Sequence, residues 1–242
     1  MSEHMALENL TVLDLTRVLA GPFCTMMLAD MGANVIKIEV PKGGDDTRSY
    51  PPFRAKNLNG ERESVYFANI NRNKKGITLN LKAPEGKEIF KELVKKADIV
   101  VENYRPGVMD KLGLGYDVLK EINPRIIYAA VSGFGCYGPY HLRPGYDILA
   151  QAMGGMMSIT GSKGGEPTRA GSALGDILGG LHVTIGILAA VNARTITGKG
   201  QRVDVSLMDS MIAATENTAL KYLETGNIPA PMGNRYAAVS PY

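Results

Sequence analysis

The stretch PEGKEIFKELVKKADIVVE at residues 84–102 decides the fold class of this chain. Its first part predicts a helix over 84–97, because apolar residues recur at helical spacing and Pro84 suits the first helical position. The following DIVVE at 98–102 predicts a short strand that is apolar on both faces. Such strands are typical of a parallel sheet that helices cover on both sides.

The same alternation of strand-like and helix-like segments continues in both directions. We expect further strands at 11–15, 34–39, 76–81, 125–131 and 202–206, and helices at 23–31, 116–121, 147–153, 176–193 and 207–223. Residues 41–59 have no period and predict a loop. Repeated strand–helix–strand units predict an α/β fold with a mainly parallel sheet flanked by helices.

The ends of the predicted strands are polar or rich in glycine, as a binding edge requires. Ligands of such sheets bind beyond the carboxyl ends of the strands. The segments that follow the strands therefore predict the position of a site: residues 15–17, Glu39, residues 102–105 and residues 132–135.

Composition excludes several classes of function. Of 242 residues, 27 are basic and 24 acidic, a net charge of +3 that is too weak for a nucleic-acid binder. The longest uncharged apolar run, 177–191, is shorter than the about 20 residues of a membrane span. The three histidines are scattered, so we expect no metal site. We expect a cytoplasmic protein that binds neither nucleic acid nor membrane, and a packed, hydrogen-bonded core role for His182.

Asp176 lies in GSALGDILGG, residues 171–180, at the start of an apolar helix. One interpretation is an N-cap aspartate that accepts a backbone N–H bond. The other is a carboxylate nucleophile: helix N-terminal amides favour its ionised form, and the flanking glycines leave room for a bulky substrate.

Two further sets of polar residues have alternative interpretations. The stretch RPGYD at 143–147 is either a turn before a capped helix or a polar cluster that faces a ligand. Basic residues at or beyond the strand ends are either separate surface charges or, jointly, a polyphosphate site. They are Arg17, Lys37, Arg48, Lys74, Lys75, Lys82, Arg105 and Lys111.

From about residue 7 to residue 242 the chain resembles family III CoA-transferases. The landmarks are LDLTRVLAGP at 13–22, GANVIKIE at 32–39, GGDDTR at 43–48, NRNKK at 71–75, ENYRPG at 102–107, NPRIIY at 123–128, GYD at 145–147, GD at 175–176 and TGKGQRVDVSL at 197–207. The resemblance implies a Rossmann-like large domain of an interlocked, ring-like homodimer.

The resemblance also implies a reaction and its nucleophile. The Asp176 carboxylate would attack an acyl-CoA thioester to give a mixed anhydride and CoA thiolate, and an aspartyl-CoA thioester would then form. A small carboxylic acid would finally collect the CoA. Coenzyme A is thus substrate and product, and no tightly bound cofactor is expected.

Positions that contact CoA in the family carry over onto this sequence. They are Val18, Leu19, Ala20, Leu79, Lys82, Asn103, Tyr104, Arg105, Lys111, Arg143 and Tyr146. The chain departs from some members at two places: Leu19 replaces a glutamine whose amide can meet the acyl group, and Val40 replaces an arginine.

Two alternatives to the transferase stay open. The family includes α-methylacyl-CoA racemases, which use a histidine in a Gly-His-Asp stretch; here Tyr146, with an ordinary pKa of about 10, takes that place. The second alternative is a truncated, non-catalytic CoA-binding fragment, because the family's chains run well past 242 residues. We expect residues 1–205 to form the CoA-binding, nucleophile-bearing domain and residues 206–242 a long helix and connector toward a small domain.

Overall fold

A six-stranded parallel sheet forms the centre of the protein in the computed structural model, which describes residues 4–54, 60 and 62–235. The strand order is β5-β2-β1-β6-β7-β8, and every neighbouring pair is parallel. The strands are β1 (Thr11–Asp14), β2 (Asn34–Glu39), β5 (Lys75–Thr78), β6 (Ile99–Glu102), β7 (Ile127–Ser132) and β8 (Arg202–Ser206). The predicted α/β fold with a mainly parallel sheet is confirmed.

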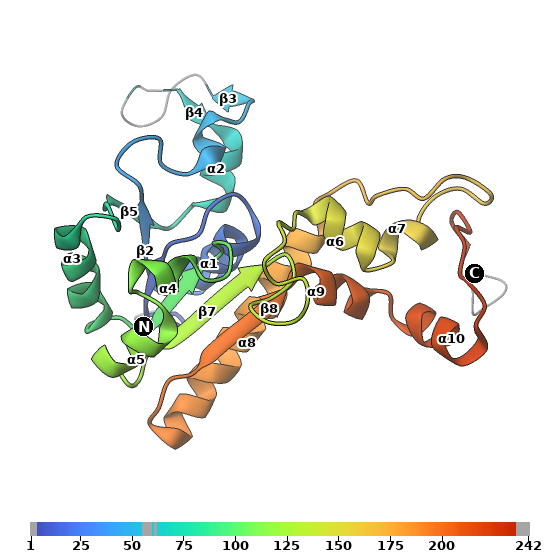
Figure 1. Ribbon diagram of the computed structural model, residues 1–242. Coiled ribbons are helices and arrows are strands. Elements are labelled where there is room, and N and C mark those ends of the chain that lie inside the picture. The colour runs from blue at the N-terminus through green and yellow to red at the C-terminus, as the bar shows by residue number, and fades with distance from the viewer. Residues whose placement is uncertain (1–3, 55–59, 61, 236–242) are drawn as a thin grey trace.

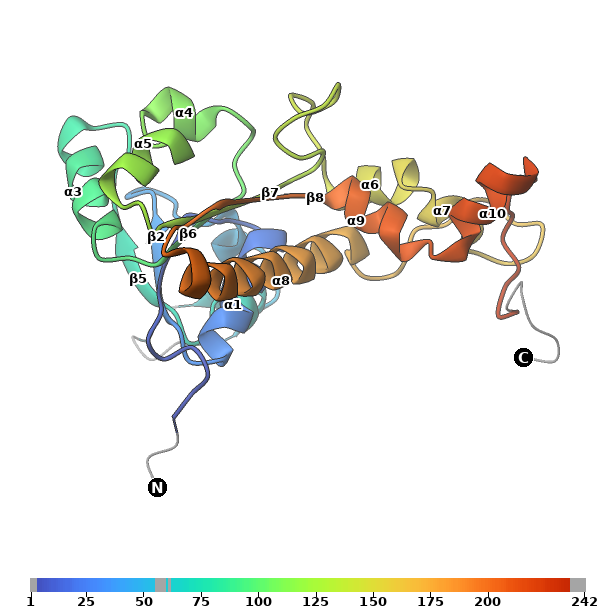
Figure 2. The same ribbon diagram turned by 90° about the horizontal axis from the view of Figure 1, so that it is seen from below.

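Helices cover both faces of the sheet (Figure 2). One face carries α1 (Ala20–Asp30) and α8 (Leu174–Thr197), and the other carries α3 (Pro84–Val94), α4 (Val108–Leu112) and α5 (Tyr116–Ile122). Alternate strand residues supply the two cores: Ile99 and Val101 pack on the first side, and Val100 packs on the second. This explains why the central strands are apolar on both faces.

Four helices extend beyond the ends of β7 and β8 as an arm (Figure 1). The arm consists of α6 (Asp147–Met153), α7 (Met156–Ile159), α9 (Leu207–Ala214) and α10 (Asn217–Thr225). The single helix predicted over 207–223 is wrong, because the chain breaks it at Thr215 and Glu216. Thr215 Oγ1 donates to the carbonyl oxygen of Ile212 at 2.7 Å, and Glu216 has a φ of 53° that no helix continues through.

Several short elements escape prediction because they are too short to show a period. The segment 41–59, predicted as loop, contains the 3₁₀ turn η1 (Asp46–Ser49) and strand β3 (Phe53–Arg54), while residues 55–59 lie outside the described part. Strand β3 pairs with β4 (Glu63–Ser64) in a small antiparallel hairpin, and α2 (Val65–Ile70) follows directly.

Helix α8 is long and apolar enough to cross a membrane by length and composition. In the fold, however, Val183, Ile187 and Ala190 are fully buried between α1 and the sheet, as in a core helix. His182 lies off this buried stripe and is exposed, so the core role predicted for it is wrong. Its ring Nδ1 lies 2.8 Å from the carbonyl oxygen of Leu178, one helical turn earlier.

Candidate functional site

A cavity of about 500 Å³ lies at the carboxyl edge of the sheet. It opens between the loops that follow β1 and β6, where the order of strands reverses on either side of β1. Such switch points are the usual ligand crevices of open α/β sheets. The wall is made of residues 17–20 after β1, 103–106 and Val108 after β6, Val131 and Ser132 at the end of β7, Gly133 and residues 143–146 after β7, and Asp46, Tyr50, Asp176 and Leu207. The cavity thus lies at the edge predicted from the strand ends.

Asp176 is the third residue of α8 and faces this cavity from the helix. The N-cap interpretation is wrong, because Ala173 occupies the cap and has no side-chain oxygen to offer. Within the described part of the chain, the Asp176 carboxylate forms no hydrogen bond and no ion pair. It is a partly buried, unpaired carboxylate on a cavity wall.

Burial, and then the charge of Asp147, raises the pKa of Asp176 to about 7. The expectation that the helix start would favour the ionised form is therefore wrong. The backbone N–H of Gly175 at the helix start donates to Asp147, and burial of the Asp176 side chain disfavours its charged form. A carboxylate of this kind ionises near neutral pH and is weakly solvated when it does, which suits nucleophilic attack.

Asp147, at the start of α6, caps the beginning of α8 from a distance in sequence. Its Oδ1 accepts the backbone N–H of Gly175 at 2.8 Å, and its Oδ2 accepts from Nε2 of Gln151 at 2.8 Å. The 143–147 stretch thus combines both of its interpretations: Asp147 is structural, whereas Arg143 and Tyr146 line the cavity.

The glycines around Asp176 serve close packing. A Cβ on Gly175 would lie 3.2 Å from Asp147 Oδ1, and one on Gly179 would lie 2.4 Å from Leu207 Cδ2. A Cβ on Gly180 would lie 2.8 Å from the carbonyl oxygen of Ala20. The expectation that these glycines leave room for substrate is wrong, because protein atoms already fill the space.

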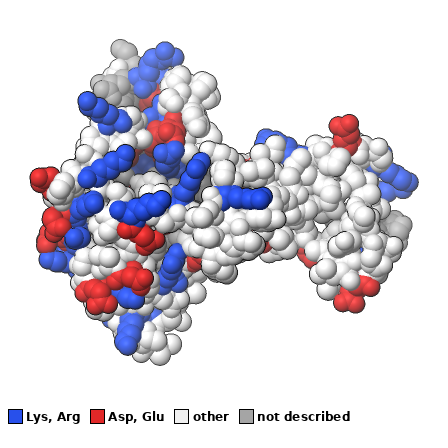
Figure 3. All heavy atoms as spheres, in the orientation of Figure 1, with Lys and Arg blue, Asp and Glu red and all other residues white. Residues whose placement is uncertain are grey.

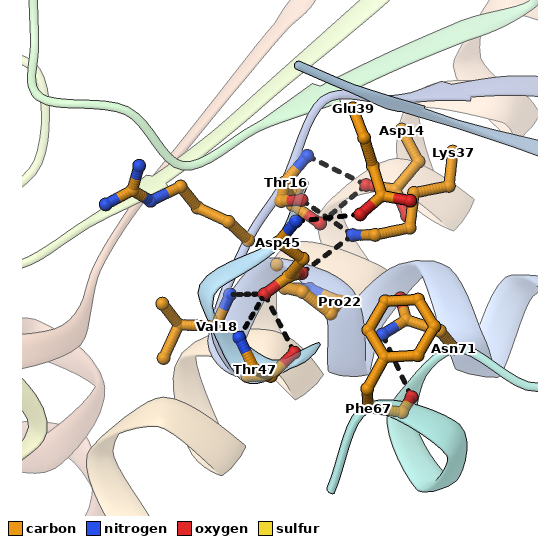
Figure 4. A network of polar contacts seen from close by, with 12 residues as sticks. Asp14, Thr16, Val18, Pro22, Lys37, Glu39, Asp45, Thr47, Phe67 and Asn71 are labelled. Atoms are coloured by element: carbon orange, nitrogen blue, oxygen red, sulfur yellow. Dashed lines mark hydrogen bonds and ion pairs between the residues drawn. The ribbon is translucent and has the colours of Figure 1, made fainter. Parts of the chain in front are cut away.

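The loop after β1 is held in an unusual conformation beside the cavity. Val18 has a φ of 67°, the left-handed region that a β-branched residue rarely enters. Its N–H donates to Asp45 Oδ1 at 3.2 Å, and Asp45 forms a fully buried ion pair with Lys37 at 2.9 Å (Figure 4). Lys37 Nζ also donates to the carbonyl oxygen of Thr16 at 2.8 Å, so the buried pair holds both sides of the loop.

A second buried ion pair supports the same loop. Lys74 Nζ lies 3.1 Å from Asp14 Oδ2 and donates to the carbonyl oxygen of Pro22 at 3.0 Å. Asp14 Oδ1 accepts the N–H of Thr16 at 2.9 Å. Burial by itself would raise the pKa of Asp14, but the charges of Lys74 and Lys37 lower it below its usual value, so the carboxylate stays ionised.

These contacts separate the basic residues of the possible polyphosphate site into two sets: those bound to other protein groups and those on the cavity wall. Lys37 and Lys74 are consumed in the buried pairs, and Arg48 pairs with Glu39 through Nε at 2.9 Å. Lys75 donates to Asn34 Oδ1 at 2.7 Å. Grouping these four as ligand contacts is therefore wrong.

Three arginines remain on the cavity wall, namely Arg17, Arg105 and Arg143. Arg17 Nη2 pairs with Asp46 at 3.0 Å, and the Arg143 guanidinium lies 4.4 Å from the centre of the Tyr140 ring. On the face shown in Figure 3, Lys and Arg side chains gather over the sheet-bearing body, whereas the arm is largely uncharged.

The structure brings most of the predicted CoA-contacting residues together and leaves three apart. The cavity wall includes Val18, Leu19, Ala20, Asn103, Tyr104, Arg105, Arg143 and Tyr146. Leu79 and Lys82 follow the edge strand β5, and Lys111 is exposed on α4; these three lie outside the wall. The Asn103 amide is occupied by the neighbouring loop, since it donates to Arg17 O at 2.7 Å and accepts from Arg17 N at 2.9 Å.

Two hydroxyl groups were not singled out from the sequence: that of Tyr66, whose pKa is influenced by the charge of Asp176, and that of Ser132, which lines the same cavity as Asp176. Tyr66 lies on the short helix α2, and its ring packs edge-on against Tyr50 at 5.9 Å. Burial, and then the charge of Asp176, raises the pKa of Tyr66 to about 12, so its hydroxyl stays neutral. Ser132 lies on the cavity wall with a buried Oγ that has no hydrogen-bond partner in the described residues. No sequence signal marks Tyr66, because α2 shows no period; Ser132 belongs to the predicted strand end.

No group of three or more His, Cys, Asp or Glu side chains in the described ranges has the arrangement of a metal site.

Comparisons with known proteins identify the family. The profile of CoA-transferase family III matches residues 7–242. The acetyl-CoA:oxalate CoA-transferase of Acetobacter aceti is 47% identical over 236 residues, covering 97% of this chain and 59% of that protein. The human succinyl-CoA:glutarate CoA-transferase is 44% identical, with 100% of this chain and 54% of that protein covered.

A solved structure agrees with these relatives. The crystal structure of a CAIB/BAIF family protein from Brucella suis superimposes with a TM-score of 0.93 at 44% identity, covering 99% of this chain and 63% of that one. The chain spans between half and two thirds of the length of these relatives. The matches confirm the resemblance stated above: the chain belongs to CoA-transferase family III.

Proposed function

We propose that this chain is the CoA-binding, nucleophile-bearing part of an acyl-CoA:carboxylate CoA-transferase, with Asp176 as the nucleophile. One observation carries the proposal: Asp176 is an unpaired, partly buried carboxylate with a pKa of about 7 on the wall of the sheet-edge cavity. In a chain of this family, such a carboxylate has the position and the proton affinity that attack on a thioester requires.

The proposed reaction conserves the thioester. The Asp176 carboxylate adds to the thioester carbonyl, the C–S bond breaks, and a mixed anhydride and CoA thiolate form. The thiolate then adds to the aspartyl carbonyl of the anhydride and expels the donor carboxylate, leaving an aspartyl-CoA thioester. The acceptor carboxylate then attacks the aspartyl-CoA thioester, which gives a second mixed anhydride and releases the CoA thiolate. The thiolate attacks the acceptor's carbonyl in this anhydride, so the new acyl-CoA forms and the Asp176 carboxylate is released.

We assign stabilisation of the negatively charged carbonyl oxygen to hydroxyl groups, because the Leu19 side chain has no hydrogen-bond donor. Negative charge develops on the carbonyl oxygen during each addition, and nearby hydrogen-bond donors lower that barrier. Ser132 Oγ, which lacks a partner, and the neutral hydroxyl of Tyr66 are the donors that we assign to this role.

We place the CoA phosphates near Arg105 and Arg143, whose guanidinium groups have no carboxylate partner among the described residues. The pantetheine would run past Val18, Leu19 and Ala20 toward Asp176. Leu79 and Lys82 follow β5 at the same carboxyl edge of the sheet as the cavity, so we assign them to the adenosine end, with Lys111 beside it.

The relatives point to the acceptor class. The transferases matched above are named for oxalate and glutarate, and another relative, from Haloarcula marismortui, for mesaconate. All three are small dicarboxylic acids. We therefore propose a small dicarboxylate as acceptor and the CoA thioester of a different small carboxylic acid as donor.

The assembly is also a proposal. Leu181, Ile185 and Ile196 expose large apolar side chains on α8, which supports a second subunit in the homodimer expected from the family. We retain residues 1–205 as the CoA-binding domain, 206–242 as the connector, and the cytoplasm as the location. The racemase alternative is not favoured, because no histidine is among the described residues of the cavity wall and Tyr146 takes the histidine position.

Covalent capture tests the proposal. The protein is incubated with succinyl-CoA and then hydroxylamine, which converts an aspartyl-CoA thioester to a hydroxamate, and peptides are weighed. We expect the hydroxamate at Asp176, none in Asp176→Asn, and normal labelling in Asp117→Asn, an exposed carboxylate of α5. CoA transfer at an undiminished rate by Asp176→Asn would contradict the proposal.

A further inference from the structure

Two buried side chains of α6 hold the segment that leads into Asp176. Asp147 accepts from Gly175, and Gln151, which is fully buried, accepts the N–H of Ala170 through Oε1 at 2.8 Å. Asp147 and Gln151 also hydrogen-bond to each other. Since Gly175 directly precedes Asp176, this pair fixes the first turn of α8 and thereby the direction of the Asp176 side chain.

The contact between α6 and α8 leaves little freedom. A Cβ on Gly175 would lie 3.2 Å from two atoms of α6, Asp147 Oδ1 and Ala150 Cβ. Asp147 is itself buried, with 8% of its surface exposed. A substitution at Asp147 therefore affects Asp176 through the hydrogen bond between Asp147 and Gly175, the residue before Asp176.

The same carboxylate acts on Asp176 through its charge. Titratable or charged groups surround the cavity on several elements. They are Asp147 on α6, Tyr66 on α2, Arg169 on the loop before α8, and Arg17, Asp46, Tyr50, Tyr104, Arg105, Arg143 and Tyr146 on the wall. Of these, Asp147 is the group that adds to burial in raising the pKa of Asp176. Arg169, 3.8 Å from Asp147 Oδ2 and half exposed, only partly offsets that charge.

We infer that Asp147 is a positioning residue for the nucleophile: its hydrogen bond with the N–H of Gly175 orients Asp176, and its nearby negative charge disfavours a second negative charge on Asp176. The charge disfavours ionised Asp176 in the empty cavity. The inference rests on the proposed function, in which Asp176 attacks the thioester.

Two substitutions separate orientation from charge. Asp147→Asn keeps an oxygen for the N–H of Gly175 and removes the charge, whereas Asp147→Ala removes both. The rate of Asp176 labelling is measured as a function of pH, and its rise on the acidic side of the profile (the acidic limb) reports ionisation of Asp176. In Asp147→Asn this acidic limb should move to lower pH by about one unit. In Asp147→Ala, labelling should fall at least about tenfold at every pH, because the first turn of α8 loses its cap. Asp117→Asn, another carboxylate in a first helical turn, should change neither.

A double variant guards against a folding defect in Asp147→Asn. The new amide N–H₂ would face Nε2 of Gln151, donor against donor. Asp147→Asn with Gln151→Glu restores a donor–acceptor pair and keeps an acceptor for Ala170, while it moves the negative charge one helical turn away. The acidic limb of the double variant should lie at the same pH as that of the unaltered protein or at a lower pH. At high pH the two proteins should be labelled at the same rate.

A direct titration makes the outcome independent of turnover. Carboxyl ¹³C NMR of aspartate-labelled full-length protein reports the pKa of Asp176, assigned through Asp176→Asn. A lower pKa in Asp147→Asn, with a parallel shift of the labelling limb, supports the inference. An unchanged Asp176 pKa and limb would overturn it, even if Asp176 is labelled as proposed. If the unaltered protein transfers CoA without labelling Asp176, the proposed function fails, and the titration still decides whether Asp147 controls the protonation of Asp176.

Discussion

Replacing Asp176 with asparagine should make the folded protein more stable at alkaline pH, although it should abolish the proposed reaction. Burial and Asp147 raise the pKa of Asp176 from its usual 3.8 to about 7. Each pKa unit corresponds to about 1.4 kcal/mol, so ionised Asp176 costs the fold at most about 4 kcal/mol. Water on the cavity side screens part of this, and we expect roughly 2 to 4 kcal/mol of added stability above neutral pH.

The sign follows from proton linkage. Between the unfolded and folded pKa values, the folded protein binds more protons at Asp176 than the unfolded chain does, so its stability falls as pH rises. The penalty is absent below the unfolded pKa and complete above about pH 7. Asparagine carries no such penalty, so the difference between the two proteins isolates this one group.

Urea unfolding of the two proteins, followed by circular dichroism at about pH 5, 6, 7 and 8, measures that difference. It should grow steadily with pH, with less than half of the full value present at about pH 5. Asp117→Asn serves as the control, because Asp117 is exposed and its hydrogen bond with Lys120, together with the charge of Lys120, lowers its pKa. A difference that does not change between about pH 5 and 8 would refute the assignment of a raised pKa to Asp176.

Three further predictions concern the scaffold and the cavity. Lys74→Met should lower the free energy of unfolding by about 3–5 kcal/mol in urea titrations, since it leaves a buried carboxylate without its cation. Gly180→Ala should cost about 1–3 kcal/mol in the same assay, because its Cβ would press on a backbone oxygen of α1, whereas Gly76→Ala, with open space around it, should cost much less. Arg105→Ala should weaken CoA binding in calorimetry by about tenfold and reduce its salt dependence, and an unchanged Kd would remove Arg105 from the phosphate site.

Elements with a strong local signal were predictable from the sequence. The helix at 147–153 and the strand at 202–206 have the predicted bounds, because periodicity and turn residues mark both ends. The binding edge was also predictable, since the carboxyl ends of parallel strands share one side of a sheet. The elements depend on residues close together in the chain, and the edge follows from the strand directions that an α/β fold dictates.

Features that depend on distant partners were not predictable. Lys37 and Lys74 look like free surface cations in the sequence, and only the fold reveals the buried carboxylates that neutralise them. The cap of α8 comes from Asp147, 28 residues before Gly175. The raised pKa of Asp176 depends on that same arrangement, so local reasoning about a helix start predicted the opposite direction.

The strained backbone at Val18 has a consequence for affinity. Because buried ion pairs already hold the loop in its left-handed turn, the energetic cost of that shape belongs to folding. A ligand entering the cavity meets a preorganised wall and does not have to freeze it, so binding energy is not diverted into ordering the loop. Loss of a lysine from one of these buried pairs should therefore lower both the free energy of unfolding and the affinity of the cavity for a ligand.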